Sequence, residues 1–231
     1  MLKILVDESF SLKEKLAWNC KGIDNFDSGL FLGQLGIGYC QKMIQTGIKP
    51  FVIITVREPI DLLRSAFQYT LEHPELYPEA IYLNEKSLSE WIVEWDANPE
   101  LPASKNFREV IRLSSAHLCG IYECSGLTEE EARDLALKNL QTCDVVAVTE
   151  KLDDILDQFR YLLPNFTKIF DCKYVLPRLN ASKRPKHILS HQAKMILKRW
   201  AKNEIIIYNE AVKRHDYLTR KARVCMALEQ R

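Results

Sequence analysis

The sequence has 231 residues, of which 47% are hydrophobic and 27% are charged, and its formal net charge is only +1. A chain of this length and composition can bury one sizeable core, so we expect a single domain over residues 1–231. No apolar stretch approaches the ~20 residues needed to cross a bilayer, which predicts a soluble protein without membrane insertion. Seven scattered cysteines without a C-x-x-C pair argue against a disulfide framework and predict reduced thiols in the cytoplasm.

Residues 1–50 suggest one strand at Leu2–Val6 and several glycine-bearing turns, but they contain no phosphate loop of the G-x-x-x-x-G-K-[ST] type. The apolar, β-branched run Phe51–Val56 predicts a central strand that is covered on both faces. A helix is expected to begin near Pro59, because a proline at the first helical position has no amide hydrogen to lose. Leu62, Leu63, Ala66 and Phe67 would lie on its inner face.

Further elements follow from periodicity and from capping signals. Thr128 and Glu131 form a capping box that opens a helix at Glu129–Gln141. The short apolar run Val145–Val148 predicts a second strand, parallel to the first and in the same sheet. Other helices are expected at Leu88–Trp95, Phe107–Leu118, Glu150–Leu163 and, broken near Asn203, Ile188–Arg223. Strands that alternate with helices indicate an α/β domain with a mainly parallel sheet and a long helical region from about residue 188.

Arg57 follows the first strand directly, and Ser65 lies about two turns into the next helix. Ligands of open α/β sheets bind at the carboxyl ends of the strands, and a guanidinium with a hydroxyl suits a phosphate. In the alternative interpretation, Arg57 pairs with Glu58 or Asp61 and Ser65 faces solvent. The residues alone leave both interpretations open.

The carboxyl-terminal part of the chain is basic. From Lys183 to Arg223 there are twelve Lys or Arg residues against three Asp or Glu residues. Such a segment can attract an anionic cofactor or an acidic sugar, and it is equally the solvated face of a long helix. His117, Cys119 and Cys124 match no common zinc spacing, so we expect no metal site.

The segment VREPIDLLRSAF, at Val56–Phe67, resembles the 3′-phosphate-binding motif of sulfotransferases that use 3′-phosphoadenosine 5′-phosphosulfate (PAPS), especially the carbohydrate and heparan-type branch. Arg57 and Ser65 match that motif in register. Leu63 stands where the family often has an arginine, with Arg64 beside it. Three further segments resemble the family in its order, namely Asn106–Gly120, Asp144–Leu156 and Leu176–Ser182.

The resemblance implies a three-layer α/β fold like that of P-loop NTPases, with a mainly parallel sheet flanked by helices. It implies transfer of a sulfuryl group from PAPS to a hydroxyl of a carbohydrate, with no nucleic-acid partner. Arg57 and Ser65 would bind the ribose 3′-phosphate. Lys183 and Arg184 would act as donors in a loop, Asn180–Lys186, that closes over the anionic nucleotide.

Two parts of the family's catalytic equipment have no counterpart here. The loop resembling P-K-[TS]-G-[ST]-[ST]-[ST], which cradles the leaving phosphate, is absent, so either the chain begins downstream of a true start or the first strand and loop have been lost. Where relatives carry an acceptor-side histidine motif, this chain has Asp27-Ser28-Gly29-Leu30. No catalytic residue is therefore assigned, and whether the chain is an enzyme stays open.

Two functions of different classes follow. The first is a PAPS-dependent sulfotransferase, and the alternative is a non-catalytic nucleotide- or glycan-binding protein that retains the sulfotransferase fold. A nucleotide kinase with a phosphate loop is disfavoured, because the required lysine loop is missing.

Overall fold

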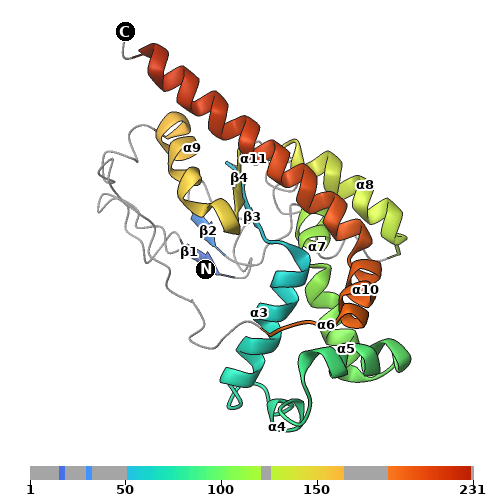
Figure 1. Ribbon diagram of the computed structural model, residues 1–231. Helices are drawn as coiled ribbons and strands as arrows, with labels where there is room; N and C mark the ends of the chain where they lie inside the picture. The colour runs from blue at the N-terminus through green and yellow to red at the C-terminus, as the bar shows by residue number, and fades with distance from the viewer. Residues whose placement is uncertain (1–15, 19–29, 33–50, 121–125, 164–186, 230–231) are drawn as a thin grey trace. The chain divides into compact units, whose positions relative to one another are not determined.

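The computed structural model of the chain describes residues 16–18, 30–32, 51–120, 126–163 and 187–229 (Figure 1). Within these ranges the chain is mostly helical. The strands are β1 (Leu16–Trp18), β2 (Leu30–Leu32), β3 (Ile53–Val56) and β4 (Val145–Val148). The helices are α3 (Pro59–Glu72), α4 (Ala80–Leu83), α5 (Leu88–Ala97), α6 (Pro102–Ile111), α7 (Leu113–Cys119), α8 (Glu129–Leu140), the 3-10 helix η2 (Thr149–Asp154), α9 (Ile155–Leu162), α10 (His191–Trp200) and α11 (Lys202–Glu229).

The chain divides into two compact units. Unit 1 comprises Met1–Val56, Ser115–Leu176 and Glu210–Arg231, and unit 2 comprises Arg57–Ser114 and Pro177–Asn209. Helices α7 and α11 contribute residues to both units. A division by internal contacts does not decide how many parts fold independently, so the single domain expected over residues 1–231 stays a prediction.

Strands β3 and β4 of unit 1 pair in parallel, with a register that runs from Ile53 opposite Val145 to Val56 opposite Val148. This pairing confirms that the two apolar runs lie side by side in one sheet. The prediction that the first run is a central strand covered on both faces is wrong, because Phe51 and Thr55 are exposed and Val56 is the one buried residue of β3. All four residues of β4 are fully buried. Helix α9 covers one face of the pair, where Ile155 and Phe159 pack against alternate residues of β4.

The predicted three-layer, mainly parallel sheet is wrong. In the parts of the chain that the structure describes, strands form only two separate two-stranded parallel sheets, β1–β2 and β3–β4. On β4, the backbone of Val146 bonds to the side chain of Gln158 in α9: its N–H donates to Oε1 and its carbonyl accepts from Nε2, both at 3.3 Å. A side-chain amide therefore occupies the positions that a further strand would need.

Helix α11 completes this closure of the strand edge. His215 Nδ1 lies 2.7 Å from the Val146 carbonyl oxygen and must donate to it, because a carbonyl only accepts. One turn later, Thr219 Oγ1 accepts from Gln158 Nε2 at 3.0 Å. These residues, here called the Gln158 cluster (Val146, Gln158, His215 and Thr219), are at most 3% exposed. Figure 1 shows α9 and α11 beside β4.

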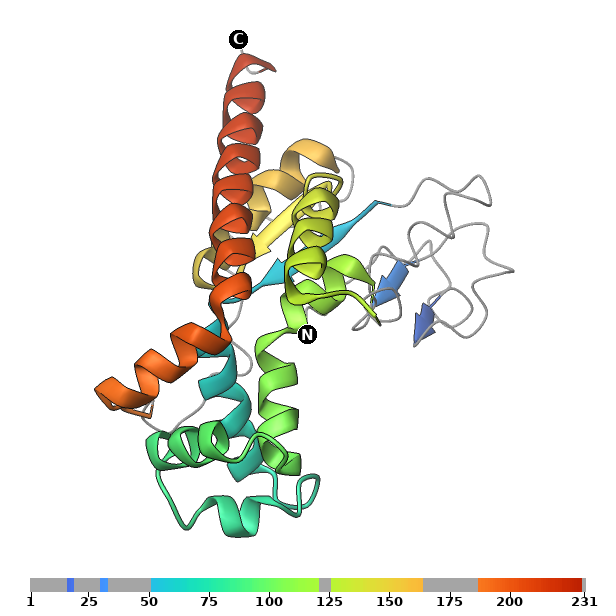
Figure 2. The same cartoon turned by 90° about the vertical axis from the view of Figure 1, so that its right-hand side faces the viewer.

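Unit 2 is a helical bundle around an aromatic core (Figure 2). Trp95 of α5 stacks on Phe107 of α6, with ring centroids 4.7 Å apart. Phe67 of α3 meets Trp95 edge to face at 6.3 Å and Phe107 in a tilted arrangement at 5.8 Å. Helix α5 begins at a complete capping box, in which Ser87 and Glu90 satisfy each other's backbone N–H groups. Helix α10 also contributes to this core through Ala193, Ile196 and Leu197.

Several predicted helices exist, but their breaks differ from the prediction. The helix expected at Phe107–Leu118 is interrupted at Arg112, which closes α6 before α7 begins. The helix expected at Glu150–Leu163 begins as η2, with a non-helical backbone at Lys151, and becomes regular in α9. The predicted break near Asn203 falls at Ala201. The capping box of Thr128 and Glu131 is confirmed, and the strand expected at Leu2–Val6 lies outside the described residues.

The Gln158 cluster generates a stability prediction. Gln158→Leu keeps the size of the side chain but leaves the buried Val146 N–H without a partner, which typically costs about 1–3 kcal/mol. We expect a loss of that size in the free energy of unfolding, measured by urea denaturation. The matched change at the exposed Gln192 of α10, Gln192→Leu, should alter it by less than about 0.5 kcal/mol. Equal effects of the two substitutions would contradict the role given to Gln158.

Candidate functional site

Arg57 stands between a strand and a firmly capped helix. Glu58 is the N-cap of α3, and its Oε2 accepts from the backbone N–H of Asp61 at 2.7 Å. Pro59 occupies the first helical turn, as predicted. The backbone on both sides of Arg57 is therefore held by regular structure, which limits the positions that its side chain can reach.

The guanidinium of Arg57 is partly buried and makes no hydrogen bond or ion pair with any residue in 51–120, 126–163 or 187–229. The carboxylates proposed as its alternative partners have other bonds. Glu58 caps α3, and Asp61 Oδ1 accepts from Arg64 Nη1 at 2.8 Å. The structure thus does not show the alternative in which Arg57 pairs with Glu58 or Asp61.

Ser65 is not brought together with Arg57. It lies six residues beyond Pro59, about 9 Å along the helix axis at 1.5 Å per residue. At 100° per residue, Ser65 points away from the buried Leu63, on the same side of α3 as Asp61. The hydroxyl of Ser65 is partly exposed, and no hydrogen bond joins it to Arg57 within the described part of the chain.

Leu63 and Arg64 of α3 both have structural roles in unit 2. Leu63 is fully buried in the core of unit 2, so an arginine at this position would have to place its charge inside that core. Arg64 does not replace it as an anion-binding group. It pairs with Asp61 and donates through Nη2 to the carbonyl of His187 at 2.6 Å.

The segment before α10 is attached to α3 through His187. In addition to the bond from Arg64, its ring packs edge-on against Phe67 with centroids 5.1 Å apart. The next residues are tied to α5, where Ser89 Oγ donates to the Ile188 carbonyl at 3.3 Å. Lys183 and Arg184, the predicted loop donors, lie outside the described residues.

A shallow hollow in unit 1 is a second place where cations gather. It is lined by Gln141, Glu210, Lys213, Arg214 and Tyr217. Arg214 Nη2 donates to the carbonyls of Gln141 and Cys143, at 3.1 and 3.4 Å, and so satisfies carbonyl groups that follow α8. Lys213 pairs with Glu210. Because both cations have protein partners, we assign a structural role to this group.

The possible metal ligands noted in the sequence have other surroundings. Cys119 Sγ lies 2.9 Å from the Ala132 carbonyl oxygen and donates to it, and Cys124 lies outside the described residues. No group of three His, Cys, Asp or Glu side chains suited to a metal ion occurs in the described part of the chain. No described helix is both long and apolar enough to span a membrane.

Sequence reasoning overlooked His215 and Gln158, two of the buried polar residues of unit 1. Both occur in amphipathic helices among charged residues, and nothing in their spacing distinguishes them from solvent-facing positions. A residue far away in the sequence, Val146, determines their role.

No family model matches this chain, and no curated protein or solved structure matches it. The resemblance to PAPS-dependent sulfotransferases, and the assignment of Arg57 and Ser65 that rests on it, therefore stay predictions.

His117 of α7 generates a prediction about pH. Burial lowers the pKa of its imidazole below the ordinary value of 6.5, and its Nε2 has no hydrogen-bond partner among the described residues. At a pH between the lowered pKa of His117 in the folded chain and its ordinary pKa in the unfolded chain, the unfolded chain binds a proton that the folded chain does not. The free energy of unfolding therefore falls as the pH falls through this range. When the pH is lowered from 7.5 to about 5.5, we expect the free energy of unfolding to decrease less in His117→Gln than in the wild type.

Urea denaturation at the two pH values measures this difference. The exposed His191 provides the control, because His191→Gln should leave the pH dependence unchanged. An identical loss in the wild type and in His117→Gln would show that His117 does not contribute to the pH dependence.

Proposed function

We propose that this chain binds an adenine nucleotide with a 3′-phosphate, PAPS or its desulfated product 3′-phosphoadenosine 5′-phosphate (PAP), and that Arg57 contacts the 3′-phosphate. The observation that carries the proposal is the guanidinium of Arg57, which has no protein partner in the described ranges although Glu58 and Asp61 are adjacent in sequence. A guanidinium offers paired N–H donors that match the oxygen atoms of a phosphate.

The local structure supports a binding role in two ways. The N-cap bond of Glu58 holds the backbone after Arg57, which reduces the entropy that ligand binding must remove. In addition, His187 is held against α3, and it follows Lys183 and Arg184 by only four and three residues in the sequence. These two cations would then add donors to the same nucleotide.

We assign a smaller part to Ser65. Its hydroxyl is two helical turns away from Arg57, and Asp61 shares its side of α3. The pairing of Asp61 with Arg64 reduces the repulsion that this carboxylate would exert on a phosphate. A single hydroxyl contributes a weaker hydrogen bond than a guanidinium does.

Sulfuryl transfer to a carbohydrate hydroxyl is the activity that the sequence resemblance implies. It needs donors on the leaving phosphate and a base for the acceptor hydroxyl, and no residue is assigned to either task. Binding of the nucleotide without transfer is therefore the form of the function that we propose first. A cytoplasmic location is part of the proposal, supported by Cys119, Cys143 and Cys225, which are free thiols.

Calorimetry tests the role of Arg57. PAP should bind more tightly than AMP, because only PAP offers a 3′-phosphate, and Arg57→Ala should weaken PAP binding about ten- to a hundredfold. Ser65→Ala should weaken it less than tenfold. AMP binding should be unchanged in Arg57→Ala.

Arg220→Ala provides the control, since it removes an exposed arginine of α11 that the proposal does not place at the nucleotide. Equal affinity of the wild type for PAP and AMP would rule the proposed function out. Equal losses of PAP affinity in Arg57→Ala and Arg220→Ala would show that PAP binds only by non-specific attraction between charges.

A transfer assay separates the enzyme from the binding protein. With labelled PAPS and a panel of glycans, we expect turnover at or near the background rate, because the loss of even one preorganised donor typically reduces the rate about a hundred- to a thousandfold. Turnover well above background that disappears in Arg57→Ala would contradict this expectation and establish the chain as a sulfotransferase.

A further inference from the structure

The connection between α3 and α5 presents apolar side chains to solvent. Leu76, Ile81 and Tyr82 are all exposed, and Ile81 is 76% exposed. Between Leu71 and Glu85 the sequence contains four Glu residues and no Asp, Lys or Arg. Lys86, the next residue, pairs with Glu94. This α4 surface, defined by Leu76, Ile81 and Tyr82 with Glu75 and Glu85, is therefore apolar with an acidic border.

The α4 surface is held in place by the core of unit 2. Ala80 and Leu83 of α4 are buried, and Trp91 Nε1 donates to the Leu83 carbonyl at 2.9 Å. The ring of Tyr82 packs edge-on against Trp91, with centroids 5.7 Å apart. Because Ala80 and Leu83 face inward, a one-turn helix must turn Ile81 outward. The exposure of Ile81 is thus imposed by a fixed local structure. Exposed apolar residues mark an interaction surface where they form a contiguous patch.

A second apolar surface lies on α11. Tyr217, Val224 and Leu228 are more than half exposed and recur at intervals of seven and four residues, which places them on one side of the helix. From Tyr217 to Leu228, a span of eleven residue steps, this side extends about 16 Å along the helix axis. The opposite side of α11 carries His215 and Thr219 of the Gln158 cluster.

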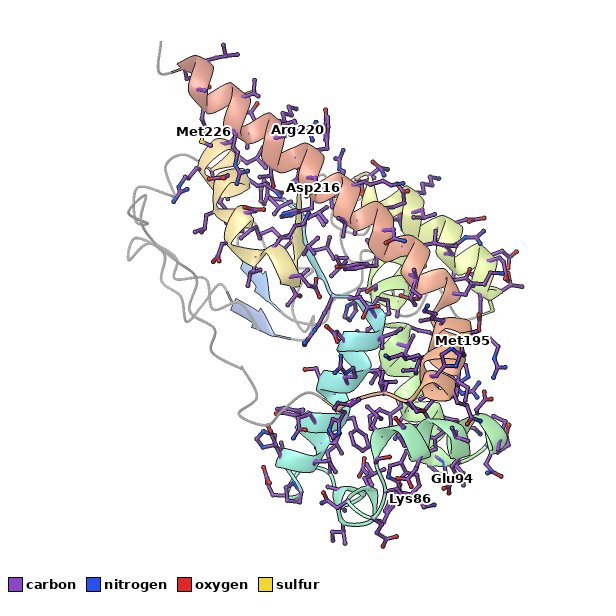
Figure 3. All side chains as sticks on the ribbon, viewed as in Figure 1. Lys86, Glu94, Met195, Asp216, Arg220 and Met226 are labelled. Carbon is purple, nitrogen blue, oxygen red and sulfur yellow. The ribbon has the colours of Figure 1, made fainter. Side chains whose placement is uncertain are left out.

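The charge of this α11 surface is positive. Arg220 and Lys221 are exposed between Tyr217 and Val224, and neither has an ion-pair partner in the described part of the chain. Figure 3 shows Arg220 and Met226 on different sides of α11. Arg223, by contrast, pairs with Asp154 and Asp157. The α11 surface, defined by Tyr217, Arg220, Lys221, Val224 and Leu228, is therefore apolar and basic.

We propose that the α4 surface of one copy of this chain binds the α11 surface of a second copy. The two surfaces are both apolar and carry opposite charge, so that contact removes exposed side chains from water and brings Glu75 and Glu85 near Arg220 and Lys221. The net charge of +1 gives only weak repulsion between copies. Because the two surfaces differ, the contact is heterologous and joins copies head to tail.

Sedimentation equilibrium of the full chain tests the proposal. Between about 5 and about 500 μM, the average mass should rise above that of one chain, as for a small and weak interface. Raising the salt concentration from about 0.05 to about 0.5 M should weaken the association about tenfold, because the charges across the interface are solvent-exposed. This association does not depend on the proposed nucleotide site.

Two charge-reversal variants identify the surfaces. Arg220→Glu/Lys221→Glu and Glu75→Lys/Glu85→Lys should each reduce self-association at least about tenfold, because each places like charges across the contact. An equimolar mixture of the two variants should associate again, since the reversed surfaces are then complementary. Circular dichroism and thermal unfolding verify that both variants fold, as expected for exposed positions.

Two further variants complete the test. Lys194→Glu/Lys198→Glu makes the same change of charge on exposed residues of α10 and should associate like the wild type. Ile81→Ser removes an exposed apolar side chain without altering charge and should weaken association, again with unchanged thermal unfolding.

Four results would overturn the proposal. The first is a wild type that stays monomeric over the whole concentration range, and the second is a control double variant that weakens association as much as Arg220→Glu/Lys221→Glu does. The third is a mixture of the charge-reversal variants that fails to associate. The fourth is association that is unchanged in Ile81→Ser. A monomeric wild type that instead sediments with vesicles containing phosphatidylserine would identify the α11 surface as a membrane contact.

Discussion

The burial of β4 is the constraint on which the fold of unit 1 depends. A strand that is covered on all sides must find partners for every backbone N–H and C=O group, because an unpaired buried group costs about 1–3 kcal/mol. At Val146 these partners are Gln158 from α9 and His215 from α11. The same bonds that satisfy the backbone hold two helices against the strand, so the sheet ends at β4 because its edge is already occupied.

The four charged residues at the start of α3 differ in their interactions. Glu58 caps the helix, while Asp61 and Arg64 neutralise each other and attach the chain at His187. Arg57 is the member of this set without a partner in the described ranges. A cation without a partner among the described residues, beside carboxylates that are bonded elsewhere, is the physical basis of the nucleotide site that we propose.

Local signals in the sequence were sufficient for much of the fold. The strand Val145–Val148, the beginning of α3 at Pro59 and the capping box of Thr128 and Glu131 are all confirmed. Each depends on interactions within a few residues, such as a proline in a first turn or a side chain that bonds three residues ahead. Of the candidate site, the position of Arg57 directly after a strand was foreseen for the same reason, but the burial of that strand on both faces was not confirmed.

By itself, then, the sequence determined most of the helices, the two apolar strands and their parallel pairing. Only the tertiary structure decided where the sheet of β3 and β4 ends, and that Arg64 bonds to Asp61 and to the carbonyl of His187. Gln158 bonds a strand 12 residues away, Arg64 bonds a carbonyl 123 residues away, and Leu63 enters a core to which α3, α4, α5, α6 and α10 all contribute. Periodicity reports which residues face inward, but the partner that a polar group meets there depends on how distant segments pack.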